Sequence, residues 1–287
     1  MTAACNNIIK LNKTITKIEH IPDILIKDIS IIIPVKSNQK GIDDFLYYFF
    51  RTQQKYPKEL IIVDNNSNKP ICISKKYKNF DFIKLVKCNK IGPASARNYG
   101  VKLSKGTWIL FTDSDCIPTE SFLNGYEYVN KNCIGYAGNV TSFGTDAISK
   151  YYETQKILIP LPIYNSNVPS YLITANCLIL KKAIELVGGF NECFKLPAGE
   201  DIDLSIRLSK VGTLDYATKS TIKHNFSDGM FGFIKRFIRY GKGAKIIEEI
   251  HEIDMKPKIF SPNEYNILNN LLSKCQYILL KIGYNIK

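Results

Sequence analysis

The chain has 287 residues, of which 45% are apolar and 23% are charged. This balance is that of a folded protein and excludes wholesale disorder, and no apolar run approaches the roughly 18 residues that a membrane-spanning helix needs. The net charge of +13 predicts an anionic partner: a nucleic acid, an anionic membrane face or a phosphorylated substrate. No signal peptide is recognisable and the cysteines are scattered singly, so we expect a cytoplasmic protein with reduced thiols.

Strands and helices are expected to alternate from residue 29 onward, after a polar extension of residues 1–28. Continuous apolar runs predict buried strands at residues 30–35, 59–63, 82–86 and 108–112, with helices at about 43–54 and 93–103 between them. Farther along, we expect helices at 118–129 and 200–211 and strands at 133–140 and 171–180. A basic helix at 230–250 and a short amphipathic one at 273–282 follow. This order predicts an α/β fold with a mostly parallel sheet.

Polar residues stand at or directly after the ends of three predicted strands: Pro34-Val35-Lys36, Asp64-Asn65 and Asp113-Ser114-Asp115. Ligands of open α/β sheets bind beyond the carboxyl ends of the strands, so these positions are candidates for a binding site. Asp113 and Asp115 can reach one cation together, and oxygen ligands favour Mg²⁺ or Mn²⁺. For so short a pattern, a turn capped by aspartate is the alternative.

Six segments extend this pattern in a fixed order: IIIPVKSN, ELIIVDNNS, GPASARNYG, LFTDSDC, ANCLILKKAIELVGGFNE and GEDIDLSIRLSKVG. In this order they resemble the family 2 glycosyltransferases, which have the GT-A fold, and the resemblance covers about residues 29–243. It implies a catalytic domain at residues 29–228, with a nucleotide-binding part at about 29–117 and an acceptor part at about 118–228. A helical C-terminal segment at 229–287 follows.

The resemblance also implies how the donor is bound. Pro34 and Lys36 would line the base and ribose, and Asp64 would accept a hydrogen bond from the base, unless it is only a turn carboxylate. The remaining donor-site residues would contact the rest of the nucleotide sugar; they are Asn65, Gly92, Arg97, Asn98, Asp113, Ser114 and Asn176. Among these, Arg97 would bond a phosphate or Asp113.

The catalytic chemistry is implied in the same way. Asp113 and Asp115, with His224, would hold Mn²⁺ or Mg²⁺, which offsets the charge that grows on the leaving diphosphate. Asp201 would deprotonate the acceptor hydroxyl, with Glu200 as the second choice, because inverting transfer needs one base. Two alternatives stay open: the Glu200-Asp201 pair as a helix cap, and His224 as a structural histidine.

The function implied is transfer of one sugar, with inversion, from a nucleotide-diphosphate sugar, with UDP expected as the nucleotide. The acceptor would be a glycan, a lipid-linked molecule or a protein, in the synthesis of cell-surface polysaccharide or glycoconjugates. The Q-x-x-R-W signature of processive synthases is absent, so transfer of single sugars is expected. A nucleotidyltransferase acting on sugar phosphates is an alternative, although the loop after the first strand has one glycine. A nucleic-acid binding protein is another, although no RNA-binding or zinc-finger motif occurs.

Residues 231–245 (FGFIKRFIRYGKGAK) interleave basic and apolar residues. On a helix, Phe233, Phe237 and Tyr240 fall on one face. Either this face packs into the domain while the charges meet water, or the segment lies on an anionic membrane. We predict the second arrangement, with the protein peripheral on the inner face of the membrane.

Overall fold

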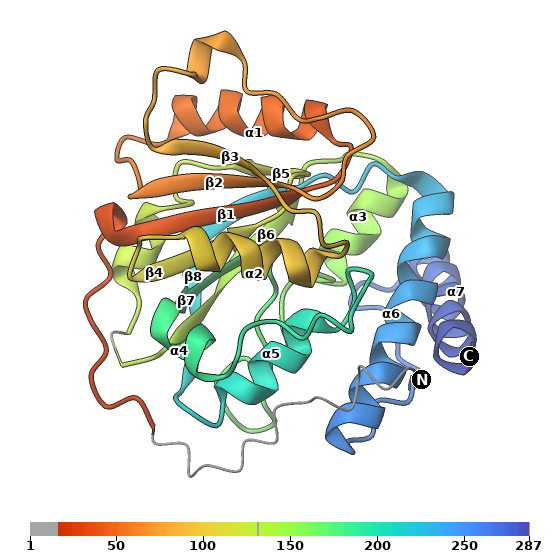
Figure 1. Ribbon diagram of the computed structural model, residues 1–287. Helices are drawn as coiled ribbons and strands as arrows, with labels where there is room; N and C mark the ends of the chain where they lie inside the picture. Colours follow the sequence, from red (N-terminus) through yellow and green to blue (C-terminus); the bar gives the residue numbers. More distant parts are fainter. Residues whose placement is uncertain (1–16, 131, 287) are drawn as a thin grey trace.

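One eight-stranded sheet forms the centre of the protein. The computed structural model describes residues 17–130 and 132–286, so the first sixteen residues of the predicted extension lie outside the described residues. The strands are ordered β3-β2-β1-β4-β7-β6-β8-β5 across the sheet, with helices around it (Figure 1). Residues 17–28 pack on the domain, since Ile24 and Ile26 are buried and the Trp108 indole N–H donates to the Asp23 carbonyl (3.2 Å).

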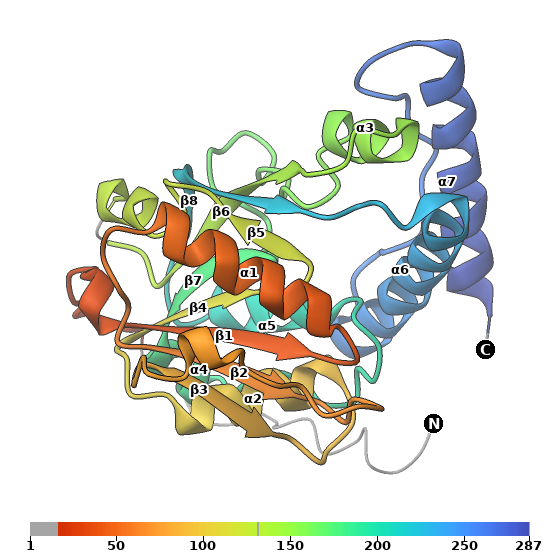
Figure 2. The same cartoon turned by 90° about the horizontal axis from the view of Figure 1, so that it is seen from above.

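The parallel half of the sheet contains β1 (Ile29–Val35), β2 (Glu59–Asp64), β3 (Ile83–Lys87) and β4 (Trp108–Thr112). Helices α1 (Gln39–Thr52) and α2 (Pro93–Leu103) lie on opposite faces of these strands (Figure 2). Every residue of β2 and β4 is buried, which explains their continuous apolar runs. Because parallel strands end at the same edge, the polar residues at the ends of β1, β2 and β4 meet there.

The second half of the sheet is mixed. β7 (Asn176–Leu180) runs antiparallel to β4, and β6 (Gly135–Ser142) connects β7 to β8 (Leu214–His224). β5 (Cys116–Pro118) pairs antiparallel with β8, with Cys116 opposite His224. This register brings the residues after β4 beside the end of β8. Four of the seven pairings are parallel, so the predicted mostly parallel α/β sheet is confirmed.

Several predicted elements differ from the structure. The helix expected at 118–129 is wrong, because the chain forms β5, turns and a short 3₁₀ helix at Asn124–Tyr128, whose position is set by burial of Phe122 and Tyr126. The strand expected at 171–180 begins only at Asn176. β8 and the short helices α3 (Ala147–Thr154) and α4 (Lys181–Leu186) have no predicted counterpart. The burial of β8 alternates irregularly, so it gives no simple period to recognise.

Helices α6 (Gly229–His251) and α7 (Ile267–Asn285) stand together at the end of the sheet toward which β1 points (Figures 1 and 2). The prediction that the aromatic face of residues 231–245 lies on a membrane is wrong. Phe233 and Phe237 are buried, with their rings 5.8 and 6.0 Å from that of Tyr152. This face is therefore occupied by the domain itself. No helix among the described residues is long and apolar enough to cross a membrane.

α6 is fixed to the start of α5 (Glu200–Leu208) at two points. Gly243 lies so close to the loop before α5 that a Cβ there would be 2.7 Å from the Ala198 carbonyl oxygen. Two turns later, His251 Nε2 lies 2.9 Å from Asp203 Oδ1 on α5. The position of α6 is thus coupled to that of the Glu200-Asp201 pair.

Candidate active site

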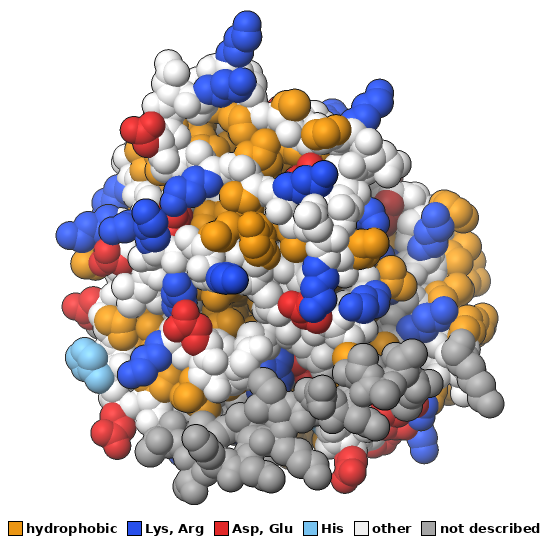
Figure 3. Space-filling view, in the orientation of Figure 1, with side chains coloured by type: hydrophobic (Ala, Val, Ile, Leu, Met, Phe, Trp, Pro, Cys, Tyr) orange, Lys and Arg blue, Asp and Glu red, His pale blue; other side chains and the backbone are white. Residues whose placement is uncertain are grey.

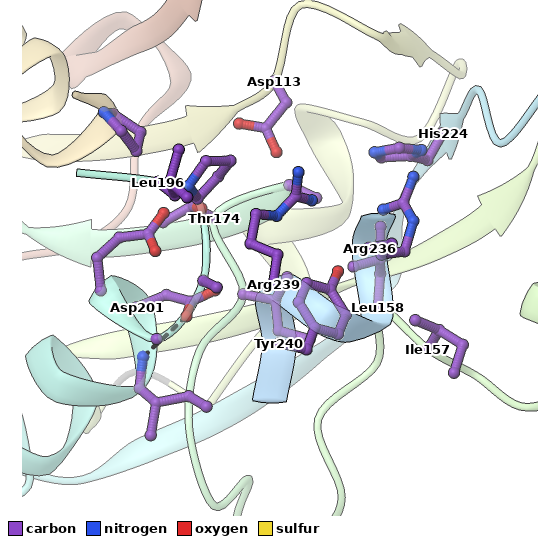
Figure 4. A pocket seen from close by; sticks show the side chains of 18 of the residues that line it. Asp113, Ile157, Leu158, Thr174, Leu196, Asp201, His224, Arg236, Arg239 and Tyr240 are labelled. Atoms are coloured by element: carbon purple, nitrogen blue, oxygen red, sulfur yellow. Dashed lines mark hydrogen bonds between the residues drawn. The ribbon is translucent and has the colours of Figure 1, made fainter. Parts of the chain in front are cut away.

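A cavity of about 990 Å³ opens between the carboxyl ends of β1 and β4, the start of α5 and one flank of α6 (Figure 4). Most of the predicted site residues line it: Pro34, Lys36, Asn65, Gly92, Arg97, Asp113, Ser114, Asp115, Glu200, Asp201 and His224. The structure thus brings together residues that are up to 190 positions apart in the chain. Three predicted residues do not line it: Asp64, Asn98 and Asn176.

Arg97 connects two carboxylates of the cavity, Asp113 after β4 and Glu200 at the start of α5. Its Nη2 lies 2.9 Å from Asp113 Oδ1, and its Nη1 lies 2.8 Å from Glu200 Oε1. Its side chain is 3% exposed. Burial by itself would lower the pKa of Arg97, but the charges of Asp113 and Glu200 outweigh it and raise that pKa. This guanidinium therefore stays charged and holds both carboxylates in place.

Asp115 and His224 lie next to each other where β5 pairs with the end of β8. The β5–β8 register places His224 Nε2 3.4 Å from Asp115 Oδ1, and the histidine side chain is buried whereas the carboxylate is half-exposed. One ligand atom each from Asp115, Cys116 and His224 lies within 4.8 Å of the others. Burial raises the pKa of the Cys116 thiol, which makes it a poor ligand. Carboxylate donors suit Mn²⁺ or Mg²⁺, whereas imidazole donors are commoner on transition metals, so the Asp115–His224 pair fits Mn²⁺ better than Mg²⁺. Asp113, which is engaged by Arg97, is not part of this group of ligand atoms.

Asp201 lies at the start of α5, on the cavity side, one residue after Glu200. Burial and the nearby charge of Glu200 raise its pKa to about 7, although Arg97 acts in the opposite direction. Its Oδ1 accepts the backbone N–H of Ile202, at 2.9 Å, and the structure pairs the carboxylate with no cationic side chain of the described residues at ion-pair distance. A carboxylate with this pKa can take up and release a proton near neutral pH.

Asp64 is engaged within its own loop. Its two oxygens accept backbone N–H bonds from Ser67 (3.0 Å) and Ile71 (3.1 Å). Burial raises its pKa, but the bonds from Ser67 and Ile71 outweigh burial and lower it. The turn-carboxylate alternative thus describes its arrangement. The adjacent Asn65 does line the cavity and accepts the Gly92 N–H (2.9 Å), which fixes the loop before α2.

Asn98 and Asn176 support the site from behind. Asn98 donates to the Phe190 carbonyl (2.9 Å) and accepts the Phe190 N–H (2.8 Å), and it lies against Gly189, whose φ of +74° favours glycine. Asn176 is 1% exposed and accepts the Tyr126 hydroxyl (2.8 Å). Both residues hold backbone and buried side chains in place and neither lines the cavity, so their contact with the nucleotide sugar stays a prediction.

The sequence interpretation missed the α6 wall of the cavity. Lys235, Arg236, Arg239 and Tyr240 line it. The spacing of Phe233, Phe237 and Tyr240 predicted that they share one face of the helix, but spacing does not tell whether a face meets water, a membrane or a cavity. Only the observed burial of Phe233 and Phe237 decides the orientation.

Comparison with known proteins identifies the family of the chain. The profile described as "Glycosyl transferase family 2" matches residues 30–182, which is more than half of the sequence. The chain belongs to this family. The matched range contains β1 to β7 and the Asp113–Asp115 segment, whereas α5, His224 and α6 lie beyond it.

Two curated relatives span most of the chain. The pre-mycofactocin glycosyltransferase of Mycobacterium tuberculosis is 25% identical over 251 residues, which are 82% of this chain and 50% of that protein. The glycosyltransferase AglE of Haloferax volcanii is 29% identical over 79% of this chain and 76% of its own length. The chain thus spans only about half the length of the first relative.

Solved structures share the fold. The mannosyltransferase PcManGT from Pyrobaculum calidifontis, in complex with GDP-Man and Mn²⁺, aligns over 90% of this chain and 71% of its own, with a TM-score of 0.57 and 14% identity. TarS of Staphylococcus aureus, residues 1–349, aligns over 76% of this chain and 65% of its own, with a TM-score of 0.55 and 17% identity. At these identities the likeness concerns the fold alone, and it agrees with the predicted GT-A arrangement.

Proposed function

We propose that the protein transfers a single sugar from a nucleotide-diphosphate sugar to an acceptor hydroxyl, with inversion at the anomeric carbon. The observation that carries the proposal is that one cavity is lined both by Asp113, Asp115 and His224 and by Asp201, whose pKa is raised to about 7. The first suits a diphosphate with its cation, and the second suits a general base. Membership of the family supports the same activity.

Asp201 takes the proton of the acceptor hydroxyl while the acceptor oxygen forms a bond to the anomeric carbon. The bond from that carbon to the phosphate oxygen breaks, and the nucleoside diphosphate leaves with the electron pair. Attack from the face opposite the leaving group inverts the configuration. Asp113, Asp115 and His224 would hold Mn²⁺ or Mg²⁺, which supplies positive charge to the leaving diphosphate.

Glu200 is less suited than Asp201 to act as the base. Its Oε1 is held by Arg97 at 2.8 Å and its side chain is 3% exposed. A carboxylate held in this ion pair orients Arg97, but it has little freedom to reach an acceptor. We therefore assign Glu200 a positioning role and retain Asp201 as the catalytic residue.

The donor nucleotide is proposed to be UDP. A crystal structure of TarS was determined in complex with UDP-GlcNAc, and that of PcManGT with GDP-Man, so the shared fold accepts either base. Pro34, Lys36 and Asn65 line the part of the cavity where the base and ribose would lie. The acceptor is proposed to be a glycan, a lipid-linked molecule or a protein in cell-surface glycoconjugate synthesis.

A donor panel tests the proposal. Purified protein is incubated with UDP-, GDP- and dTDP-sugars and Mn²⁺, and the released nucleotide is measured. We expect UDP from one UDP-sugar, at a rate that falls in the Asp201→Asn variant. Release of pyrophosphate would instead favour the nucleotidyltransferase alternative, and no reaction with any donor would overturn the proposal.

We propose that membrane contact involves α7 instead of α6. Ile267, Leu271, Ile278 and Ile282 of α7 are 90, 58, 53 and 44% exposed, and the right-hand edge of the molecule in Figure 3, where α7 lies, is accordingly apolar. The helix contains lysines but no acidic residue, which suits anionic lipid. Co-sedimentation with anionic but not neutral vesicles, lost in Leu271→Glu/Ile278→Glu, is the expected result.

A further inference from the structure

The α6 wall of the cavity carries a cation that the protein does not neutralise. The structure gives Arg239 no ion pair with any described carboxylate, and its Nε is buried without a hydrogen-bond partner. Its guanidinium carbon lies 5.8 Å from the centre of the Tyr240 ring. Figure 4 shows the Arg239 side chain pointing from α6 into the cavity, toward the side where Asp113 and His224 lie. The side chain is half-buried, and its charge is free to pair with an anionic ligand in the cavity.

Arg236, one turn earlier, is held differently. Its side chain is 10% exposed, its Nη2 lies 3.0 Å from Asp228 Oδ2, and its guanidinium lies 5.1 Å from the centre of the Tyr152 ring. Its Nε is also buried without a partner. Arg236 is therefore a fixed, mostly neutralised group, whereas Lys235 is exposed with its Nζ 3.9 Å from the centre of the Phe231 ring. The unmatched charge on this wall comes mainly from Arg239, with Lys235 at the rim.

We propose that Arg239 binds a phosphoryl group inside the cavity, supported by Arg236 and Lys235. A guanidinium with a free edge is the side chain best suited to the paired oxygens of a phosphate. The family match ends at residue 182, so it does not cover this wall. The inference rests on the proposed transferase function and extends it: either the donor diphosphate or a phosphate on the acceptor occupies the α6 wall.

Binding measurements on the full chain test the inference. Wild type, Arg239→Gln and Arg239→Lys are compared with Lys242→Gln, which removes the same charge from the same helix outside the cavity. The probes are inorganic pyrophosphate in EDTA, UDP with Mn²⁺, and glycerol 3-phosphate added to UDP-saturated protein, with glycerol as its uncharged control. Calorimetry gives each Kd, and thermal denaturation checks that the variants are folded.

We expect Arg239→Gln to weaken pyrophosphate about tenfold or more, and Arg239→Lys less, because a lost charge-assisted bond is of this size. A parallel loss for UDP identifies the donor diphosphate as the source, and a loss for glycerol 3-phosphate identifies the acceptor. If Arg239→Gln matches Lys242→Gln with all three probes, the inference is wrong although the transferase proposal stands. If wild type binds no nucleoside diphosphate, the transferase proposal fails, and the pyrophosphate result still decides the role of Arg239.

Discussion

Two arginines, one on each wall of the cavity, are held in opposite ways. On the wall beyond the strands, Arg97 is buried between Asp113 and Glu200, at 2.9 and 2.8 Å. On the α6 wall, Arg239 has no carboxylate partner among the described residues. A guanidinium that is paired within the fold holds structure together, whereas one left unpaired is available to a ligand. The same residue type thus contributes to stability on one wall and to binding on the other.

The largest expected effect is on turnover. Asp201→Asn should lower kcat about 10²–10⁴-fold, which is the usual contribution of a general base, while the Kd for UDP with Mn²⁺ stays near that of wild type. In wild type, kcat should fall as the pH drops below about 7, because protonated Asp201 cannot accept the proton. Steady-state kinetics and calorimetry measure both, with the surface variant Asp81→Asn as the matched control. An unchanged kcat would remove Asp201 from the mechanism.

The second prediction contrasts the two arginines directly. Arg97→Met should lower the free energy of unfolding by about 3–5 kcal/mol, because it leaves Glu200 and Asp113 near each other without their shared cation. Arg239→Met should change it by less than about 1 kcal/mol, because no described carboxylate loses a partner. Urea denaturation of both variants provides the measurement. An equal loss of unfolding free energy in both variants would contradict the view that Arg97 is paired within the fold and Arg239 is not.

The third prediction concerns the cation that Asp115 is proposed to hold. Asp115→Ala should weaken Mn²⁺-dependent UDP binding about tenfold or more, and should leave metal-free binding unchanged. The half-exposed position of Asp115 predicts that the variant folds normally. Calorimetry with Mn²⁺ and with EDTA separates the two contributions. Full activity of wild type in excess EDTA contradicts the metal role altogether.

The smallest effect concerns stability and pH. With a pKa of about 7 against an ordinary 3.8, folded Asp201 keeps a proton that the unfolded chain releases. This stabilising contribution is complete below about pH 4 and is lost as the pH rises through about 7. Asp201→Asn loses nothing over this range, so its stability relative to wild type should rise by about 1–3 kcal/mol from about pH 5 to pH 8. Parallel stability curves for the two proteins would argue against a raised pKa.

Much of the strand-end wall was predictable, because its signals are local. Continuous apolar runs mark buried strands, and Asp113 and Asp115 directly follow one of them. The roles of Asn98 and Asn176 were not predictable, since a polar residue near a site looks the same whether it faces a ligand or holds a turn. The α6 wall was missed for a related reason: helical spacing separates Phe233 from Lys235 but does not assign either face to its surroundings.

The glycine at position 243 determines how wide the cavity is. In any other residue, the Cβ at this position would clash with the Ala198 carbonyl oxygen. Glycine therefore lets the backbone of α6 come into direct contact with the loop before α5. The separation of the α6 backbone from the loop that leads into α5 is therefore set at this point, and with it the space between the α6 wall and Asp201. The length of an acceptor then decides whether it fits, as well as its chemistry. A methyl group added at Gly243 would push α6 away from Ala198 and change the width of the cavity.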